Sequence, residues 1–261
     1  MPAPLRWFSW TLVLIVACDN DITSAKMYVS QEPFAIALDA TNASRFTLTG
    51  VNGDIQVVGV SRSDSVFLVG TREVGSRESQ TDATIRLQDL QVHFDQQGDT
   101  ILVRTIQPAN QEGRNYTVNY EITLPEFFVV RLAAANGNID VFDLANDLTT
   151  HIANGNTNLK AIAGSVHALG VNGNVFCEAQ LPQSGTLELG ATNGEIALAI
   201  PTDTSALFEA TVANGSIHLV NLTLEDLMST STKVTGRLGS GQGSIGLRVG
   251  NGTITATGVA P

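Results

Sequence analysis

The sequence predicts an all-β protein whose second half is a parallel β-helix, or β-solenoid, with about 18–21 residues per coil. The dipeptide Asn-Gly recurs along the chain, and its copies in the second half start at positions 136, 154, 172, 193 and 214 before a last copy at 251. Alternating polar and apolar residues follow each copy, as in a half-buried strand. The chain has 24 glycines and only 15% charged residues, which is typical of a protein rich in strands and turns.

The Asn-Gly pairs are predicted to be structural turn positions, each one a corner of a coil. Glycine suits a corner that needs positive φ, and asparagine tolerates such a conformation better than most residues. The last interval, from 214 to 251, is close to two coils, and Gln242-Gly243 within it is interpreted as a degenerate copy. The seven pairs are Asn52-Gly53, Asn136-Gly137, Asn154-Gly155, Asn172-Gly173, Asn193-Gly194, Asn214-Gly215 and Asn251-Gly252.

Alignment of the copies on their glycine predicts which side chains point inward. The next residue is always polar, the one after is β-branched, and the residue two further on is apolar or small, as in Asn138, Ile139 and Val141. Residues two apart on a strand share a face, so Ile139 and Val141 are expected in the core and Asn138 outside. Gly137→Val should therefore impair folding, whereas Asn138→Ser should be nearly silent.

An antiparallel meander or β-sandwich also fits the pattern, with Asn-Gly as type I′ hairpin turns. Two features favour the parallel helix. The unit that repeats is the whole period rather than each half of it, and each position within the corner keeps its residue type, as stacking of equivalent corners would require.

Residues 33–130 are predicted to form a β-rich region before the repeats of 131–261. One short helix is expected between residues 76 and 95, because Ala83, Leu87 and Leu90 have helical spacing and Ser76 or Ser79 can cap it. Strands are expected around 34–38, 46–49, 66–69, 101–103 and 116–124.

The N-terminal segment 1–17 is interpreted as a lipoprotein signal peptide. A short apolar run ends in Ile15-Val16-Ala17-Cys18, which resembles the lipobox of bacterial lipoproteins. Cys18 is then the lipidation site, residues 18–32 form a polar tether, and the second cysteine, Cys177, stays unpaired. Cys177 occupies an inward position and is expected to be a buried thiol.

Several segments together resemble the bacterial putative-adhesin family. They are VNGDIQVVGV (51–60), YEITLP (120–125), RLAAANGNIDV (131–141) and GQGSIGLRVGNGTITATG (241–258), in addition to the other Asn-Gly copies. The resemblance covers nearly the whole chain after the signal peptide. It implies a right-handed, solenoid-like fold and a role in attachment, but it transfers no functional residues.

Charge and motifs exclude several classes of function. The net charge of −11 disfavours nucleic-acid binding. The sequence has no HExxH, CxxC or GxSxG motif, so no metal site, cofactor or nucleophile elbow is expected. Residues 241–246 match GxGxxG, but a strand-like segment follows them rather than the helix that a dinucleotide site needs. Pairs of carboxylates such as Asp140 and Asp143 are interpreted as solvated turn residues.

The sequence therefore predicts a lipid-anchored protein of the bacterial cell envelope, an adhesin or a binding or structural module without catalysis. Its expected partners are the membrane, through the anchor, and a protein or glycan ligand. A regulatory or scaffolding lipoprotein is one alternative, and a polysaccharide-active β-helix enzyme is another. The oligomeric state stays open, as does the choice between the inner membrane facing the periplasm and the cell surface.

Overall fold

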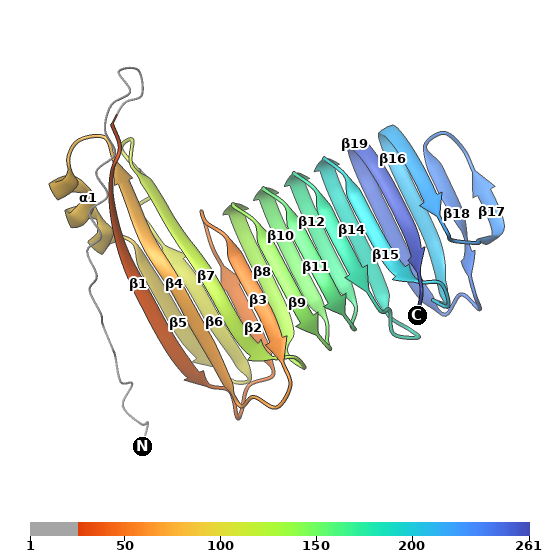
Figure 1. Ribbon diagram of the computed structural model, residues 1–261, viewed down its shortest axis with the longest axis horizontal. Coiled ribbons are helices and arrows are strands. Elements are labelled where there is room, and N and C mark those ends of the chain that lie inside the picture. Colours follow the sequence, from red (N-terminus) through yellow and green to blue (C-terminus); the bar gives the residue numbers. More distant parts are fainter. Residues whose placement is uncertain (1–25) are drawn as a thin grey trace.

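The computed structural model describes residues 26–261, so the predicted signal peptide and Cys18 lie outside the described residues. The described chain is all-β, with 19 strands joined in one mixed sheet and one short α-helix. Its strands lie side by side in a long row, with α1 near one end and β17 and β18 at the other (Figure 1). No helix within residues 26–261 has the length and apolar character needed to cross a bilayer.

The strands form two ladders that meet at the Asn-Gly corners. In the first ladder each repeat strand leads into a corner, and neighbouring repeat strands are parallel. In spatial order this ladder contains β5 (Gln91–Gln97), β6 (Thr100–Ile106), β2 (Arg45–Thr49), β8 (Val129–Asn136), β10 (Leu148–Asn154), β12 (Val166–Asn172), β14 (Thr186–Asn193), the first half of β19 (Gly243–Val259), the first half of β16 (Ala206–Val220), β18 (Lys233–Leu238) and β17 (Glu225–Ser229).

In the second ladder each repeat strand leaves a corner, and the repeats again pair in parallel. In spatial order this ladder contains β1 (Tyr28–Asp39), β4 (Ser65–Ser76), β7 (Asn115–Pro125), β3 (Ile55–Val60), β9 (Ile139–Leu144), β11 (Thr157–Ile162), β13 (Val175–Ala179), β15 (Ile196–Pro201) and the second halves of β19 and β16.

Antiparallel pairing is confined to the two ends of the described sheet. At one end β1 pairs with β4, β4 with β7 and β5 with β6, and at the other end β18 pairs with β16 and β17. The repeats themselves are parallel throughout, so they do not form an antiparallel meander. The extra residues of the longer repeats lie in loops such as 180–185, which leaves the strand register unchanged.

In-register stacking places like residues above one another in the core. Ile139 pairs with Ile55 on one side and Thr157 on the other, and all three side chains are buried. Val141 and Cys177 are also fully buried, as their alignment predicts. One hydrophobic cluster contains residues of both ladders, so each ladder covers the apolar face of the other.

The spatial order of the last repeats differs from their order in the sequence. Strand β19 lies between β15 and β16, so the corner at Asn251 falls between those at Asn193 and Asn214. The interpretation of Gln242-Gly243 as a degenerate corner is wrong. Gly243 pairs with Ala206 in the first ladder, at the start of β19, and the long interval is filled by the excursion of the chain through β17 and β18.

The N-terminal region adds strands to both ladders rather than forming a separate layer. The boundary expected at residue 130 falls inside β8, and residues 28–32, expected in the tether, belong to β1 and pair with β4. The predicted helix is α1 (Gln80–Arg86), followed by a single 3₁₀ turn over Leu87–Asp89. The Ser79 hydroxyl caps it by accepting from the N–H of Asp82.

The corners also show which edge of the stack is open. The N–H of each corner glycine donates to the asparagine carbonyl of the next repeat, as Gly173 does to Asn193 and Gly194 to Asn251. Gly215 belongs to the last repeat, and no described strand pairs with β16 beyond it on that side. The second half of β16 is thus an unpaired edge, whereas β18 covers the first half.

The corner glycines are predicted to be irreplaceable because the repeats approach each other too closely for a side chain. Gly137 has φ of 120°, and a Cβ at this position would lie 2.1 Å from the carbonyl oxygen of Gly53. Gly137→Ala should therefore lower the free energy of unfolding by at least about 2 kcal/mol more than a substitution that meets only backbone strain. Chemical denaturation measures the difference.

Gly98 supplies the matched control for Gly137. Its φ of 62° is also positive, but a Cβ there has no atom within 4 Å. Gly98→Ala should cost about 1 kcal/mol from conformation alone. If both substitutions lower the free energy of unfolding equally, close stacking at the corner is not the reason that glycine is required there.

Candidate functional site

The asparagines of the corners form one continuous chain of side-chain hydrogen bonds. The Nδ2 of Asn154 donates to Oδ1 of Asn136 at 2.9 Å, and Asn172 donates to Asn154 at 2.8 Å. The same bond links every neighbouring pair of the column, and at its start Asn52 donates to the carbonyl of Tyr116. In spatial order the column is Asn52, Asn136, Asn154, Asn172, Asn193, Asn251 and Asn214.

A second polar column runs beside the first, two residues further along each repeat. The Oδ1 of Asn138 accepts from the N–H of Asn156 at 3.1 Å, and Asp54 accepts from the N–H of Asn138 at 2.7 Å. Asn174 continues the column by accepting from Glu195. Asn138 thus bridges two repeats. The expectation that Asn138→Ser would be nearly silent assumed only that this side chain lies outside the core, and these hydrogen bonds contradict that reasoning. The corner side chains use their hydrogen-bonding groups within the protein.

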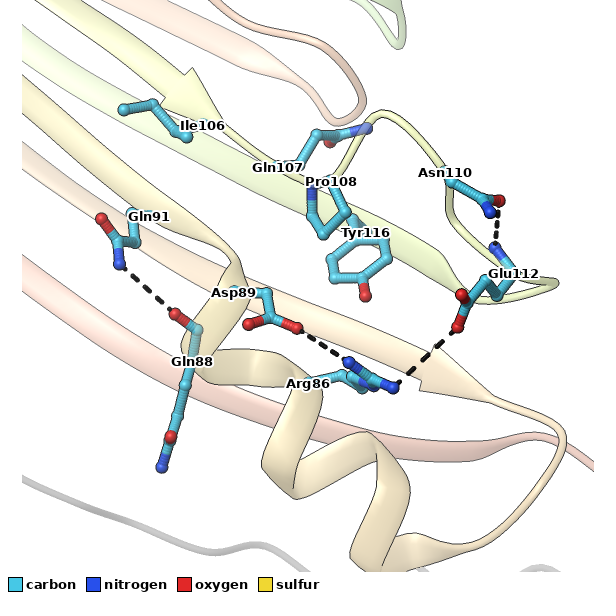
Figure 2. Close-up of a pocket in the computed structure, with 10 residues that line it drawn as sticks. All are labelled: Arg86, Gln88, Asp89, Gln91, Ile106, Gln107, Pro108, Asn110, Glu112 and Tyr116. Carbon is cyan, nitrogen blue, oxygen red and sulfur yellow. Dashed lines mark hydrogen bonds and ion pairs between the residues drawn. The ribbon is translucent and has the colours of Figure 1, made fainter.

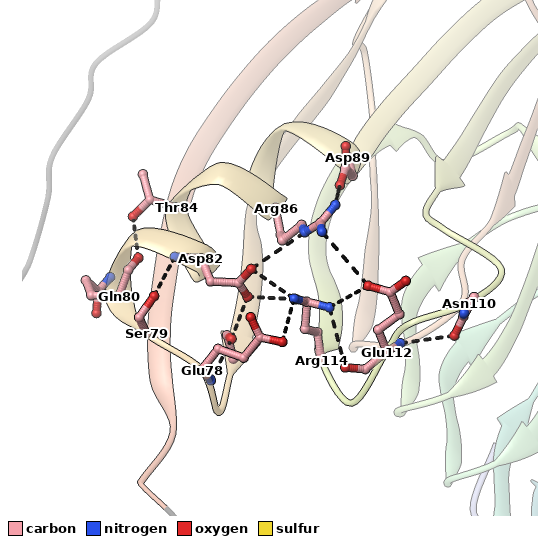
Figure 3. Close-up of polar contacts among 11 residues, drawn as sticks. Glu78, Ser79, Gln80, Asp82, Thr84, Arg86, Asp89, Asn110, Glu112 and Arg114 are labelled. Atoms are coloured by element: carbon pink, nitrogen blue, oxygen red, sulfur yellow. Dashed lines mark hydrogen bonds and ion pairs between the residues drawn. The ribbon is translucent and has the colours of Figure 1, made fainter.

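A buried arginine ties α1 to the loop before β7 (Figure 3). Arg114 is only 5% exposed. Its Nε donates to Asp82 Oδ2 at 2.7 Å, and its two terminal nitrogens pair with Glu78 and Glu112, each at 2.9 Å. Hydrogen bonds from Arg114 and from the Ser76 hydroxyl lower the pKa of the Asp82 carboxyl from 3.8 to about 2.

Arg86 lies at the end of α1 and faces three carboxylates at longer distances. Its guanidinium nitrogens are 3.4 Å from Asp89, 3.7 Å from Asp82 and 3.9 Å from Glu112. The side chain is 40% exposed, so these ion pairs are partly solvated. Arg86 and Arg114 together offset much of the negative charge of this end of the protein.

A cavity of about 540 Å³ lies between the end of α1 and the loop before β7 (Figure 2). The cavity is widely open to solvent, and its volume lies within the range of small-molecule sites, about 300–1,000 Å³. Its lining comes from three segments that are remote in sequence from the Asn-Gly repeats. The lining residues are Arg86, Gln88, Asp89, Gln91, Ile106, Gln107, Pro108, Asn110, Glu112 and Tyr116.

Tyr116, the second residue of β7, contributes to this cavity a hydroxyl that no described residue hydrogen-bonds. The residue is 2% exposed, and its hydroxyl makes no hydrogen bond to any residue of the described chain. Burial raises the pKa of Tyr116, so the phenol is neutral at physiological pH and can both donate and accept. In Figure 2 the hydroxyl points toward Asp89, Arg86 and Glu112.

Sequence reasoning did not identify these cavity residues. Residues 106–115 have the composition of a polar loop, and no motif links them to the helix that precedes them in the chain. The predicted lipidation site, Cys18, lies outside the described residues. Cys177 is fully buried in the core, and burial raises the pKa of its thiol to about 12, so it is inert as a nucleophile.

Comparison with known proteins finds no matching family model and no matching curated protein. Among solved structures, a putative cell adhesion protein from Clostridium sporogenes is 12% identical with a TM-score of 0.48, covering 88% of this chain and 100% of its own. A putative adhesin from Bacteroides fragilis is 8% identical with a TM-score of 0.28, covering 89% and 98%. A putative lipid binding protein from Parabacteroides distasonis is 10% identical with a TM-score of 0.27, covering 87% and 96%. All three TM-scores lie below 0.5, so the function has to be inferred from this chain's own residues.

The asparagine column predicts that two substitutions at Asn154 lower the free energy of unfolding by different amounts. Asn154→Ala removes two hydrogen bonds and should cost about 2 kcal/mol of unfolding free energy. Asn154→Asp should cost more at pH 7, because a carboxylate oxygen would then face the Oδ1 of Asn136. That repulsion raises the pKa of the introduced acid, so the excess cost should disappear as the pH falls and the acid is protonated.

Asn42 provides the control for this pair of variants. It is exposed and makes no hydrogen bond within the described chain, so Asn42→Asp should change stability by less than about 0.5 kcal/mol. Urea titrations at pH 7 and pH 4 compare the four proteins. If Asn154→Asp is no worse than Asn154→Ala at pH 7, the asparagine column does not stabilise the stack.

The Arg114 network predicts a pH-dependent loss of stability. The pKa of Asp82 is lower in the folded protein, so its contribution is complete above about pH 4 and is lost as the pH falls through about 2. Asp82→Asn should lower the melting temperature at pH 7, and the gap to the natural protein should close over that window. A gap that stays constant down to pH 2 would contradict a stabilising ion pair at Asp82.

Proposed function

We propose that this protein is a non-enzymatic, adhesin-like binding module of the bacterial cell envelope, held at the membrane by lipid on Cys18. The observation that carries the proposal is the cavity at the α1 end, with a Tyr116 hydroxyl that no described residue satisfies. The hydroxyl opens onto the cavity, where water or a ligand can pair with it.

The repeats serve as the scaffold of this site. We propose that they form a right-handed parallel solenoid with about 18–21 residues per coil. In-register parallel pairing and the two polar columns fix each repeat against the next. A stack of this kind offers long, fixed surfaces for contacts with protein or glycan.

The chemistry of the cavity supports binding rather than catalysis. A glycosidase needs one carboxyl group that holds a proton at working pH and a second that is ionised. The two carboxylates that line the cavity, Asp89 and Glu112, are each held by a guanidinium, that of Arg86 or Arg114. Asp140, a further carboxylate considered in the sequence, lies outside the cavity on β9 of the second ladder. It accepts a hydrogen bond from the side-chain amide of Asn158.

The position of the cavity favours an envelope scaffold as a second candidate function. Strand β1 starts beside α1, where the side-chain amide of Gln80 donates to the carbonyl of Val29. The chain from Cys18 to Tyr28 is short, and when fully extended it reaches at most about 35 Å. A lipid on Cys18 would therefore keep the cavity close to its own membrane, within reach of ligands of the same envelope.

Labelling and attachment assays in the bacterium that makes the protein test the proposal. The full-length protein should incorporate radiolabelled palmitate, Cys18→Ala should lose the label, and Cys177→Ala should keep it. Deletion of the gene should reduce attachment of intact cells to glycan-coated and protein-coated surfaces, and Cys18→Ala should reproduce the loss.

Three outcomes of these assays are decisive. Unchanged labelling of Cys18→Ala would overturn the anchor. If deletion leaves attachment unchanged, and the natural protein is retained on the cell's own envelope material, the scaffold function would replace the adhesin function. Neither attachment nor retention would contradict a binding role altogether.

A further inference from the structure

The cavity at the α1 end holds two polar groups that the described protein leaves unsatisfied. The Tyr116 hydroxyl has no hydrogen-bond partner among residues 26–261, and only 2% of the Tyr116 surface is exposed. The side-chain oxygen of Gln107, which also lines the cavity, is buried and has no partner. Such groups normally find a partner, and a ligand in the cavity would supply one.

The charges around the cavity disfavour an anionic ligand. Asp89 and Glu112 line it, and Asp82 contacts both Arg86 and Arg114. These three carboxylates outnumber the two guanidinium groups. A phosphate or a sugar acid would meet this excess of negative charge.

A metal ion or an organic cation fits the site poorly as well. Each of the three carboxylates lies within ion-pair distance of a guanidinium, so a cation would have to compete with an arginine for it. Within residues 26–261 no group of three His, Cys, Asp or Glu side chains is placed to hold a metal. What remains available on Asp89 and Glu112 is acceptor capacity for neutral hydroxyl groups.

An apolar wall completes the site. Ile106 is 47% exposed at the cavity, and the Pro108 ring stands beside the Tyr116 ring in Figure 2. A ligand that suits the cavity therefore has many neutral hydroxyl groups and one apolar face of C–H groups. Pyranose sugars combine these two properties.

We infer that the cavity binds a neutral saccharide, with the Tyr116 hydroxyl and the Asp89 and Glu112 carboxylates bonding to sugar hydroxyls and Pro108 packing on the ring. This inference rests on the proposed binding role and names its ligand class. Arg86, which lies between Asp89 and Glu112, donates to a further sugar oxygen, and the Arg114 network holds the helix and the loop in position (Figures 2 and 3).

Titration calorimetry on the purified full-length protein in detergent tests the inference. The probes are N-acetylglucosamine, galactose, glucose and mannose as neutral sugars, glucuronate as an anion and ethanolamine as a cation. At least one neutral sugar should bind, and its affinity should be at least about tenfold higher than that of glucuronate or ethanolamine. A tenfold difference corresponds to about one hydrogen bond.

Two tyrosine variants separate ligand binding from folding. Tyr116→Phe should weaken sugar binding about tenfold and leave the melting temperature equal or higher, because it removes a hydroxyl that has no partner in the described part of the chain. Tyr120→Phe is the control: its hydroxyl bonds to Thr105 at 2.7 Å outside the cavity, so its loss should lower stability and leave sugar affinity within about twofold.

The inference is overturned if no neutral sugar binds, if glucuronate or ethanolamine binds more tightly, or if Tyr116→Phe leaves sugar affinity unchanged. Lower stability of Tyr116→Phe would also contradict it, since the hydroxyl would then have a structural partner. Cells that attach through a protein with no sugar affinity would refute this inference and keep the proposed function. Sugar binding without attachment or envelope retention would refute the cellular role and keep the cavity's ligand.

Discussion

Close contact between equivalent corners is the constraint on which the rest of this structure depends. Each repeat places its glycine against the glycine carbonyl of the preceding repeat, with no room for a side chain between them. This approach brings the neighbouring asparagine amides within hydrogen-bond distance, and each amide then fixes the next. Because the corners are in register, the β-branched residues that follow them also stack, and one continuous core results.

The cavity forms where this constraint ends. Beyond β2 and β3 there are no further Asn-Gly corners, and the sheet continues through antiparallel strands, a short helix and the loop before β7. Residues of the helix and the loop do not stack on equivalents, so their positions depend on specific ion pairs, chiefly those of Arg114. The regular part of the protein thus supplies rigidity, whereas its irregular end supplies polar groups that remain available to a ligand.

The sequence predicts what is local and periodic. The inward positions of Ile139 and Val141, the buried Cys177 and the helix capped by Ser79 follow from residue type and spacing. The insertion of β19 between β15 and β16 could not be predicted, because the corners at Asn214 and Asn251 carry equivalent motifs and either can be last. The bridging role of Asn138 and the cavity around Tyr116 depend on contacts between distant segments, which no spacing rule describes.

Hydrogen exchange of the corner amides tests whether stacked corners in this spatial order hold the protein together. In the order seen here, the N–H groups of Gly137, Gly155, Gly173, Gly194 and Gly252 each reach a further repeat, whereas that of Gly215 lies at the open edge. Slow, closely similar exchange is expected for the first five, and fast exchange for Gly215. Fast exchange at Gly252 with protection at Gly215 would contradict the order, and fast exchange at all of the corners would contradict the stack.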